Sequence, residues 1–152
     1  MIGRICTAPF SAISRTNDSD QDILEMVGTA GYPFRVLAIE MSSALTTDER
    51  LTIRLLRRST TGSGGSALTP VNVNGGIATT VQTAVNSLVT TPGTAGAVLH
   101  AWQWSQLAPF IYRPTPAELI MSISAGRLAL HLGTAVASTR TISGFVTWEE
   151  FG

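Results

Sequence analysis

Short runs in which apolar and polar residues alternate are the feature of this sequence that most restricts its fold. In residues 50–55, the apolar Leu51, Ile53 and Leu55 fall on one side of an extended chain, and Thr52 and Arg54 fall on the other. A repeat of two is the side-chain period of a β-strand, whereas a helix repeats every 3.6 residues. The pattern therefore predicts a strand here.

The same segment has a helical alternative. Thr46 followed three residues later by Glu49 resembles a capping box, and leucine and arginine are good helix formers. A strand is favoured because the neighbouring segments also have strand character.

Segments with strand character recur along the chain between breaks rich in Gly, Pro and Asn. The segments are residues 35–41, 50–55, 67–73, 78–85, 97–104, 110–112, 119–123, 128–132 and 141–149. The breaks include residues 31–33 (GYP), 61–66 (TGSGGS, expected to be a hairpin loop or surface excursion), 74–76 (NGG) and 91–93 (TPG). Short strands with a turn signal about every 8–12 residues are typical of sandwiches and barrels. We therefore expect an all-β antiparallel sandwich of about eight strands.

The N-terminal part of the chain is less regular. We expect at most one short helix, for which residues 20–26 are the candidate. Residues 1–30 form either a plain first strand with a loop or an extended arm that packs on a neighbouring subunit. With 152 residues and no linker, the chain is expected to be one domain, residues 1–152.

Composition favours a protein that associates with other proteins. All ten basic residues are arginine, and they balance ten acidic residues, so the formal net charge is zero. Arginine is favoured at interfaces, and a small domain with little net charge tends to associate. A neutral chain argues against a nucleic-acid binder, which normally has a strongly basic face.

Compartment signals are few. The single Cys6 cannot form an internal disulfide, so the chain is compatible with a reducing cytosol. The N-terminal residues lack a signal-peptide pattern, and no run approaches the roughly 20 apolar residues of a spanning helix. We expect a soluble protein that is synthesised in the cytoplasm and does not bind membranes.

Metal sites have little support. Asp18, Asp20 and Asp22 alternate as at the start of a calcium loop, but Ile23 and Thr29 occupy the positions that require glycine and glutamate. A solvated loop or a helix cap is favoured. The two histidines, His100 and His131, lack cysteine or acid partners at metal-ligand spacing, so satisfied or surface histidines are favoured.

Catalytic patterns are equally weak. No serine lies in a Gly-x-Ser-x-Gly motif, and the glycine-rich residues 62–66 lack the lysine of a phosphate-binding loop. Glu149 and Glu150 are adjacent, so in a strand they point to opposite faces and cannot act together as a glycosidase pair. We therefore expect no enzyme, no cofactor and no metal.

Two groups of residues are candidates for protein contacts. Trp102 and Trp104 are two residues apart, so their indoles share one strand face with His100. A core layer or a subunit interface is favoured over an exposed carbohydrate-binding platform. The second group, Arg54, Arg57 and Arg58, is expected to form a basic edge that is solvated or faces another subunit; binding of an anionic partner is the alternative.

The order of motifs along most of the chain carries further information. From residue 20 onward the motifs are residues 20–23 (DQDI), 38–40 (AIE), 51–55 (LTIRL), 62–70 (GSGGSALTP), 112–116 (YRPTP), 124–128 (SAGRL) and 144–152 (GFVTWEEFG). This order resembles a group of small virion proteins of tailed bacteriophages, which are similar to jelly-roll decoration, or cement, proteins on the outside of capsids. The resemblance implies a jelly-roll sandwich, self-association into dimers or trimers, and binding to the major capsid protein.

The leading expectation is therefore a structural virion protein located on a phage capsid surface, where it stabilises the lattice. Two alternatives remain open. One is a tail or fibre component for host attachment, and the other is a carbohydrate-binding β-sandwich module that uses the tryptophan pair.

Overall fold

The computed structural model describes residues 3–15, 21–44, 47–74, 81–118, 121–122, 125–133 and 140–152. All regular elements in these ranges are β-strands. They are β1 (Arg4–Arg15), β2 (Gln21–Val27), β3 (Phe34–Ser43), β4 (Arg50–Arg58), β5 (Ser66–Ala67), β6 (Val71–Asn72), β7 (Ala84–Val89), β8 (Ala95–Ser105), β9 (Phe110–Tyr112), β10 (Met121–Ser122), β11 (Arg127–Leu132) and β12 (Arg140–Glu150). Eight of these strands have six or more residues, so the expectation of an all-β chain with about eight strands is confirmed.

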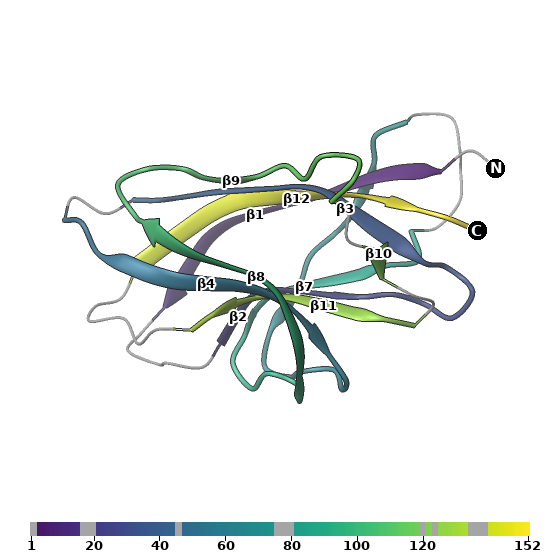
Figure 1. Cartoon of the computed structure of the whole chain (residues 1–152), viewed down its shortest axis with the longest axis horizontal. Coiled ribbons are helices and arrows are strands. Elements are labelled where there is room, and N and C mark those ends of the chain that lie inside the picture. Colours follow the sequence, from purple (N-terminus) through teal and green to yellow (C-terminus); the bar gives the residue numbers. More distant parts are fainter. Residues whose placement is uncertain are drawn as a thin grey trace.

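The strands form two antiparallel sheets that pack face to face (Figure 1). Sheet A has the order β10-β3-β12-β1-β6, and β9 also pairs with β3. Sheet B has the order β5-β7-β2-β11-β4-β8. The predicted β-sandwich is thus confirmed.

The first four strands pair with late strands in reverse order. β1 pairs with β12, β2 with β11, β3 with β9, and β4 with β8. Consecutive strands β1, β2, β3 and β4 alternate between the two sheets. Most pairings therefore join residues that are far apart in the sequence.

Alternation explains why residues 50–55 form a strand. Leu51, Ile53 and Leu55 are buried against sheet A, whereas Arg54 is exposed on the opposite face of β4. The strand prediction is confirmed and the helical alternative is wrong. The Thr46 of the proposed capping box lies outside the described residues.

The hydrophobic core lies between the sheets. Sheet A contributes Val36, Val146 and Trp148, and sheet B contributes Leu128 and Leu130 among others. Trp148 is the largest fully buried side chain. Each large apolar side chain removed from water contributes about 1.5–3 kcal/mol, so this layer supplies the main driving force for folding.

The short helix that residues 20–26 allowed does not form in the described part of this segment, which begins at residue 21. Residues 21–27 are strand β2, which pairs with β7 on one side and β11 on the other. The first six residues of β2 are all buried. A central strand that is covered on both faces loses the alternation that marks a half-exposed strand, and this hid β2 in the sequence.

Three other boundaries differ from the prediction. In place of the strand expected over residues 67–73 there are two short strands in different sheets, β5 and β6, because Pro70 between them cannot continue a ladder. The strand expected over residues 78–85 is β7, at residues 84–89; residues 75–80, including most of the NGG turn, lie outside the described residues. Of residues 119–123, only β10 is described.

The N-terminal strand lies inside sheet A. β1 pairs with β12 along most of its length, and its residues Cys6 and Thr7 also pair with β6. Residues 1–2 and 16–20 lie outside the described residues. Exchange of this segment between subunits stays a prediction.

Candidate functional site

The two predicted contact groups lie on neighbouring strands at one rim of sheet B. The arginines are on β4 and the tryptophans are on β8, where Ile53 faces Trp102 and Leu51 faces Trp104 in the ladder. β8 is the last strand of this sheet. Figure 1 shows β8 beside β4 in the lower layer, with β9 in the layer above.

The tryptophans face inward, toward sheet A. Trp104 is only 4% exposed, and its indole Nε1 donates a hydrogen bond to the Ala108 carbonyl oxygen at 2.8 Å. Trp102 is half-buried and packs against the core. His100 stacks on Trp102 with ring centroids 5.3 Å apart, so the prediction that these three rings share one strand face is confirmed.

The same rings join the two sheets at this rim. Trp102 contacts Tyr112 at 5.2 Å and Phe110 at 5.3 Å between ring centroids, and both of these partners belong to β9 of sheet A. Tilted and edge-on pairs of this kind contribute about 0.5–1.5 kcal/mol beyond the area that they bury. The aromatic cluster therefore closes the side of the sandwich between β8 and β9.

The arginines do not form a single basic edge. Arg54 is exposed and Arg57 is half-buried, but the Arg58 side chain is only 4% exposed. Arg58 points away from the core, onto the outer face of sheet B, where other residues cover it. The expected row of three solvated arginines is thus wrong at Arg58, and contact roles for Arg54 and Arg57 stay predictions.

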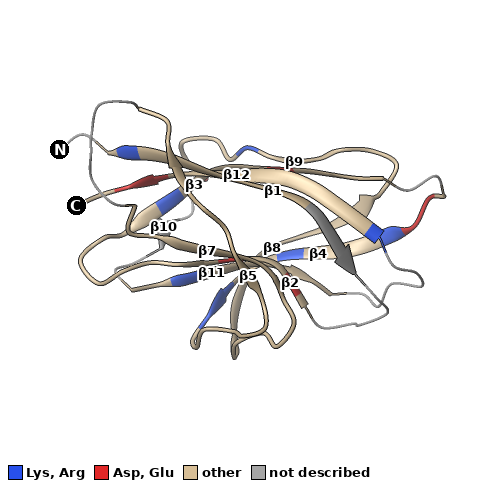
Figure 2. Ribbon diagram, turned by 180° about the vertical axis from the view of Figure 1, so that it is seen from behind, with Lys and Arg blue, Asp and Glu red and all other residues tan. Residues whose placement is uncertain are grey.

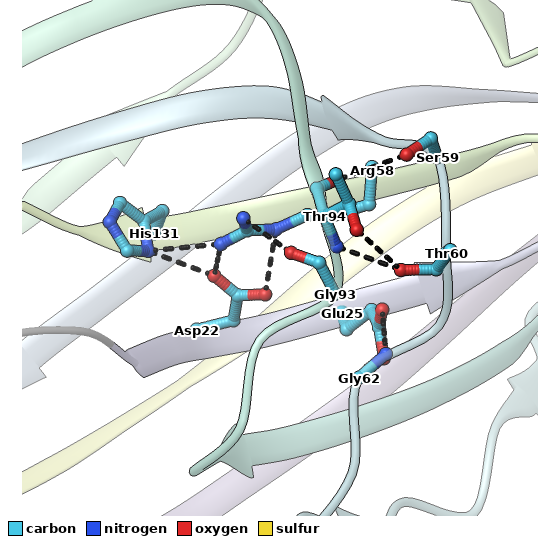
Figure 3. Close-up of polar contacts among 9 residues, drawn as sticks. All are labelled: Asp22, Glu25, Arg58, Ser59, Thr60, Gly62, Gly93, Thr94 and His131. Atoms are coloured by element: carbon cyan, nitrogen blue, oxygen red, sulfur yellow. Dashed lines mark hydrogen bonds and ion pairs between the residues drawn. The ribbon is translucent and has the colours of Figure 1, made fainter.

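Arg58 belongs to a buried polar network that the sequence analysis missed (Figure 3). Its Nη2 lies 2.5 Å from Asp22 Oδ1, and its Nε lies 3.2 Å from Asp22 Oδ2. His131 Nδ1 lies 3.0 Å from Asp22 Oδ1 and 3.2 Å from Arg58 Nη2. Asp22 is fully buried in β2, so its expected place in a solvated loop or helix cap is wrong. Asp18 and Asp20 lie outside the described residues.

Two loops cover this network. Arg58 Nη1 donates to the Gly93 carbonyl oxygen at 2.8 Å, and the Gly62 amide donates to Glu25 Oε1 at 2.9 Å. Burial, and to a lesser extent the charge of Asp22, raises the pKa of Glu25. The loops are also joined to each other, because Ser63 and Thr91 exchange two backbone hydrogen bonds. Residues 61–66 are thus a surface excursion, as expected, and they are pinned to the sheet beneath.

The adjacent glutamates point to opposite faces of β12, as predicted. Glu149 pairs with Arg35 near the surface. Glu150 turns inward, where it accepts hydrogen bonds from the Trp148 indole at 3.2 Å and the Thr83 amide at 2.6 Å. Glu150 therefore serves as an acceptor that satisfies buried donors.

Small-molecule and metal sites find little support in the described part of the chain. A shallow depression of about 200 Å³ over β3 and β12 is lined by Glu40, Met41 and Ser143 among others, and it is smaller than most ligand pockets, which hold roughly 300–1,000 Å³. Among the described residues, no group of three or more His, Cys, Asp or Glu side chains could hold a metal ion. Nor do these residues include a helix long and apolar enough to cross a membrane.

The β8 rim of sheet B carries aromatic and small apolar side chains, and within the described ranges it pairs with β4 alone. It lies next to a polar network whose groups pair with one another. Such a rim suits contact with another protein. Searches of protein-family models, curated proteins and solved structures found no match to this chain.

Proposed function

We propose that this protein is a structural virion protein, a jelly-roll decoration or cement protein that binds the outside of a tailed-phage capsid. It would act by stabilising contacts between capsid subunits. Its partners would be the major capsid protein and other copies of itself.

The strand pairing carries this proposal. When the two-residue strands β5, β6 and β10 are left out, together with the six-residue β7, which lies at the far side of β2, the orders are β1-β12-β3-β9 in one sheet and β2-β11-β4-β8 in the other. Among these eight strands the first pairs with the last, the second with the seventh, the third with the sixth and the fourth with the fifth. A long two-stranded ribbon that is rolled into two layers has this pairing. A jelly roll is an eight-stranded double sheet of this kind, and it is common in viral capsid proteins. The likeness is one of fold, so it supports the function by analogy.

The distribution of charge is a second support. Several arginines are neutralised within the chain, in the pairs Arg35–Glu149, Arg113–Glu40 and Arg140–Glu49. Figure 2 shows basic and acidic segments next to each other at both ends of the molecule. Copies of a protein whose surface has no strong potential of one sign do not repel each other, so they can pack closely, as a capsid coat requires.

The tryptophan contacts count against sugar binding. A sugar-binding platform needs an open aromatic face, but Trp104 is buried and Trp102 packs on Phe110 and Tyr112. Both rings are therefore used within the sandwich.

The mechanism would be mass action. A protein that binds the assembled lattice and not its free subunits stabilises the lattice in proportion to the logarithm of its concentration over Kd. Many copies, each bound across a joint between capsid subunits, would add up to a large effect on the shell.

The test compares particles assembled with and without this chain. Particles that lack it should release DNA at a lower temperature or lower salt, and adding the purified protein should restore their stability. Unchanged stability would contradict the proposal. Copy number is a second readout, because hundreds of copies per particle fit a capsid coat and a few copies fit a tail or fibre component.

A further inference from the structure

β8 is an open rim strand of unusual length. It has eleven residues and pairs with β4 on one side, and no strand among the described residues pairs with its other side. In an antiparallel ladder the backbone groups of successive residues point alternately to the two sides, so roughly half of β8 offers unpaired N–H and C=O groups.

The other rims are short or interrupted. β5 and β6 have two residues each, and β9 has three residues and is followed by Arg113 and Pro114. Beyond Thr7, β1 pairs with β12 alone, but this stretch contains Pro9, which has no N–H to donate, and it ends on a charged residue, Arg15. Charges, prolines and short lengths are the devices by which proteins keep open strands from pairing with other chains.

β8 has only one protective feature of any kind, an irregular ladder with β4 opposite Leu55 to Arg58, which affects the N-terminal half of the strand. Its sequence, AGAVLHAWQWS, contains no charged residue and no proline. Val98 is 54% exposed, and Ala101 is exposed as well. His100 and Trp102 stack on each other and contact Tyr112, but both side chains are still partly exposed. A strand added beside β8 would cover apolar and aromatic surface as well as satisfy backbone groups.

The chemistry of this strand favours a second copy of the same chain as its occupant. An uncharged strand has no charge that could attract a charged partner. Two identical uncharged strands, in contrast, can pair without electrostatic repulsion. Antiparallel pairing also has two-fold symmetry, which closes after two copies. The rim is roughly 35 Å long by strand geometry and roughly 20 Å thick, since the sheets lie about 10 Å apart and carry side chains outside. The product, roughly 700 Å², is the most that one partner could bury at this rim, and it is of the same order as the roughly 800 Å² of a standard interface.

We propose that two copies of this chain pair antiparallel along β8, so that sheet B continues from one subunit into the other. This pairing goes beyond the proposed capsid role and does not depend on it. A chain that is monomeric in solution would refute the pairing and leave the proposed binding to the major capsid protein untouched. Particles that are equally stable without the chain would refute the capsid role and leave the pairing along β8 untouched.

The first experiment measures mass by sedimentation or light scattering. The wild-type chain should be a dimer, and the double variant Val98→Lys/Ala101→Lys should be a folded monomer, because lysines on the rim repel across the two-fold axis. Its melting temperature should fall slightly, since Ala101 faces Arg54 across the ladder with β4. The matched control is Val71→Lys, since Val71 is 53% exposed on the two-residue rim strand β6. This variant should remain a dimer. A wild-type monomer, a double variant that still dimerises, or a control that dissociates would each overturn the pairing.

Cysteine cross-linking tests the geometry. In a two-fold antiparallel pair a residue meets its own copy only near the axis. Single cysteines at Ala97, Val98, Ala101 and Gln103 should therefore give disulfide dimers with one maximum along β8. Cys6 does not interfere, because it is fully buried and burial raises the pKa of its thiol to about 11. A cysteine at the exposed Ser11 of β1 is the control. Equal cross-linking at Ser11 and along β8 would overturn the proposed interface.

Discussion

Arg58 and Asp22 form a two-point ion pair beneath the loops that cover the outer face of sheet B. The guanidinium Nη2 and Nε contact the two carboxylate oxygens at 2.5 and 3.2 Å, and both side chains are almost completely buried. Removal of two charges from water is costly, and their mutual attraction offsets this cost only while both partners are present. Because Arg58 also donates a hydrogen bond to the Gly93 carbonyl oxygen, the covering loop at Gly93 is held in place by an ion pair between β2 and β4.

Loss of Arg58 alone should strongly destabilise the protein. Arg58→Met would leave the Asp22 carboxylate buried without its cation, which costs about 3–5 kcal/mol of the free energy of unfolding. Denaturant titration measures this change. Arg54→Met is the matched control on the same strand face; because Arg54 is exposed, its loss should cost less than about 0.5 kcal/mol.

The double variant Asp22→Leu/Arg58→Met should recover most of the lost stability, because apolar side chains of similar volume often replace a buried ion pair without loss. Equal stability of Arg58→Met and Arg54→Met would show that the pair contributes nothing.

Trp104 should be a stability residue of the rim. Trp104→Ala removes a buried indole and its hydrogen bond to Ala108, and truncation of a core tryptophan costs about 3–5 kcal/mol. Leu107→Ala, in the adjacent turn, is the control, since Leu107 is exposed and should change stability by less than about 0.5 kcal/mol. If thermal melting gave the two variants the same midpoint, the core role of Trp104 would be excluded.

Much of the sandwich could be predicted because its strands are covered on one face. β4 shows this most clearly, with Leu51, Ile53 and Leu55 inside and Arg54 outside. β2 escaped prediction because its first six residues are all buried, so its sequence has no period of two. Two-residue strands such as β5 and β6 depend on their neighbours alone, and no sequence pattern marks them.

The buried network could not be predicted from sequence spacing. It depends on the register of three strands, in which His131 faces Asp22 on β2 and Arg54 on β4, and on a bulge of the β2–β11 ladder next to Leu130. Of the three residues Asp22, Arg58 and His131, only His131 lay in a segment predicted to be a strand, and no spacing in the sequence linked it to the other two. A shift of one residue would have turned Arg58 or Asp22 to the other face of the sheet.

Gly93 should be required for the contact between the two covering loops. A Cβ atom on Gly93 would collide with the backbone carbonyl oxygen of Thr60, and backbone cannot move aside as a side chain can. Gly93→Ala should therefore cost about 1–3 kcal/mol, as other forced insertions into packed regions do. It should also speed hydrogen exchange of the Ser63 and Thr91 amides, which now pair with each other.

Gly133→Ala is the control for this variant. Its new Cβ atom would lie 3.3 Å from the guanidinium of Arg54, a flexible and exposed group that can move, so stability should change by less than about 0.5 kcal/mol. Wild-type exchange rates in Gly93→Ala would mean that the loops do not need this close approach.

Glu25 should make a contribution to the free energy of unfolding that decreases as pH rises. Burial and, less strongly, the charge of Asp22 raise the pKa of this carboxyl above its ordinary value. Between the ordinary and the raised pKa the folded state binds more protons than the unfolded state, so the free energy of unfolding falls with increasing pH across this window. Below the window both states are protonated and the component is fully present. Glu25→Gln should abolish this part of the pH dependence in denaturant titrations.

Glu118 provides the opposite case. It is exposed, and its hydrogen bonds with Thr115 lower the pKa of its carboxyl, so it contributes stability that is lost as pH falls. Glu118→Gln should therefore remove a contribution by which the free energy of unfolding increases with pH. The decrease with pH that is due to Glu25 should remain. The same pH profile in wild type and Glu25→Gln would mean that Glu25 is solvated in the folded protein, and that the loop carrying Gly62 does not cover it.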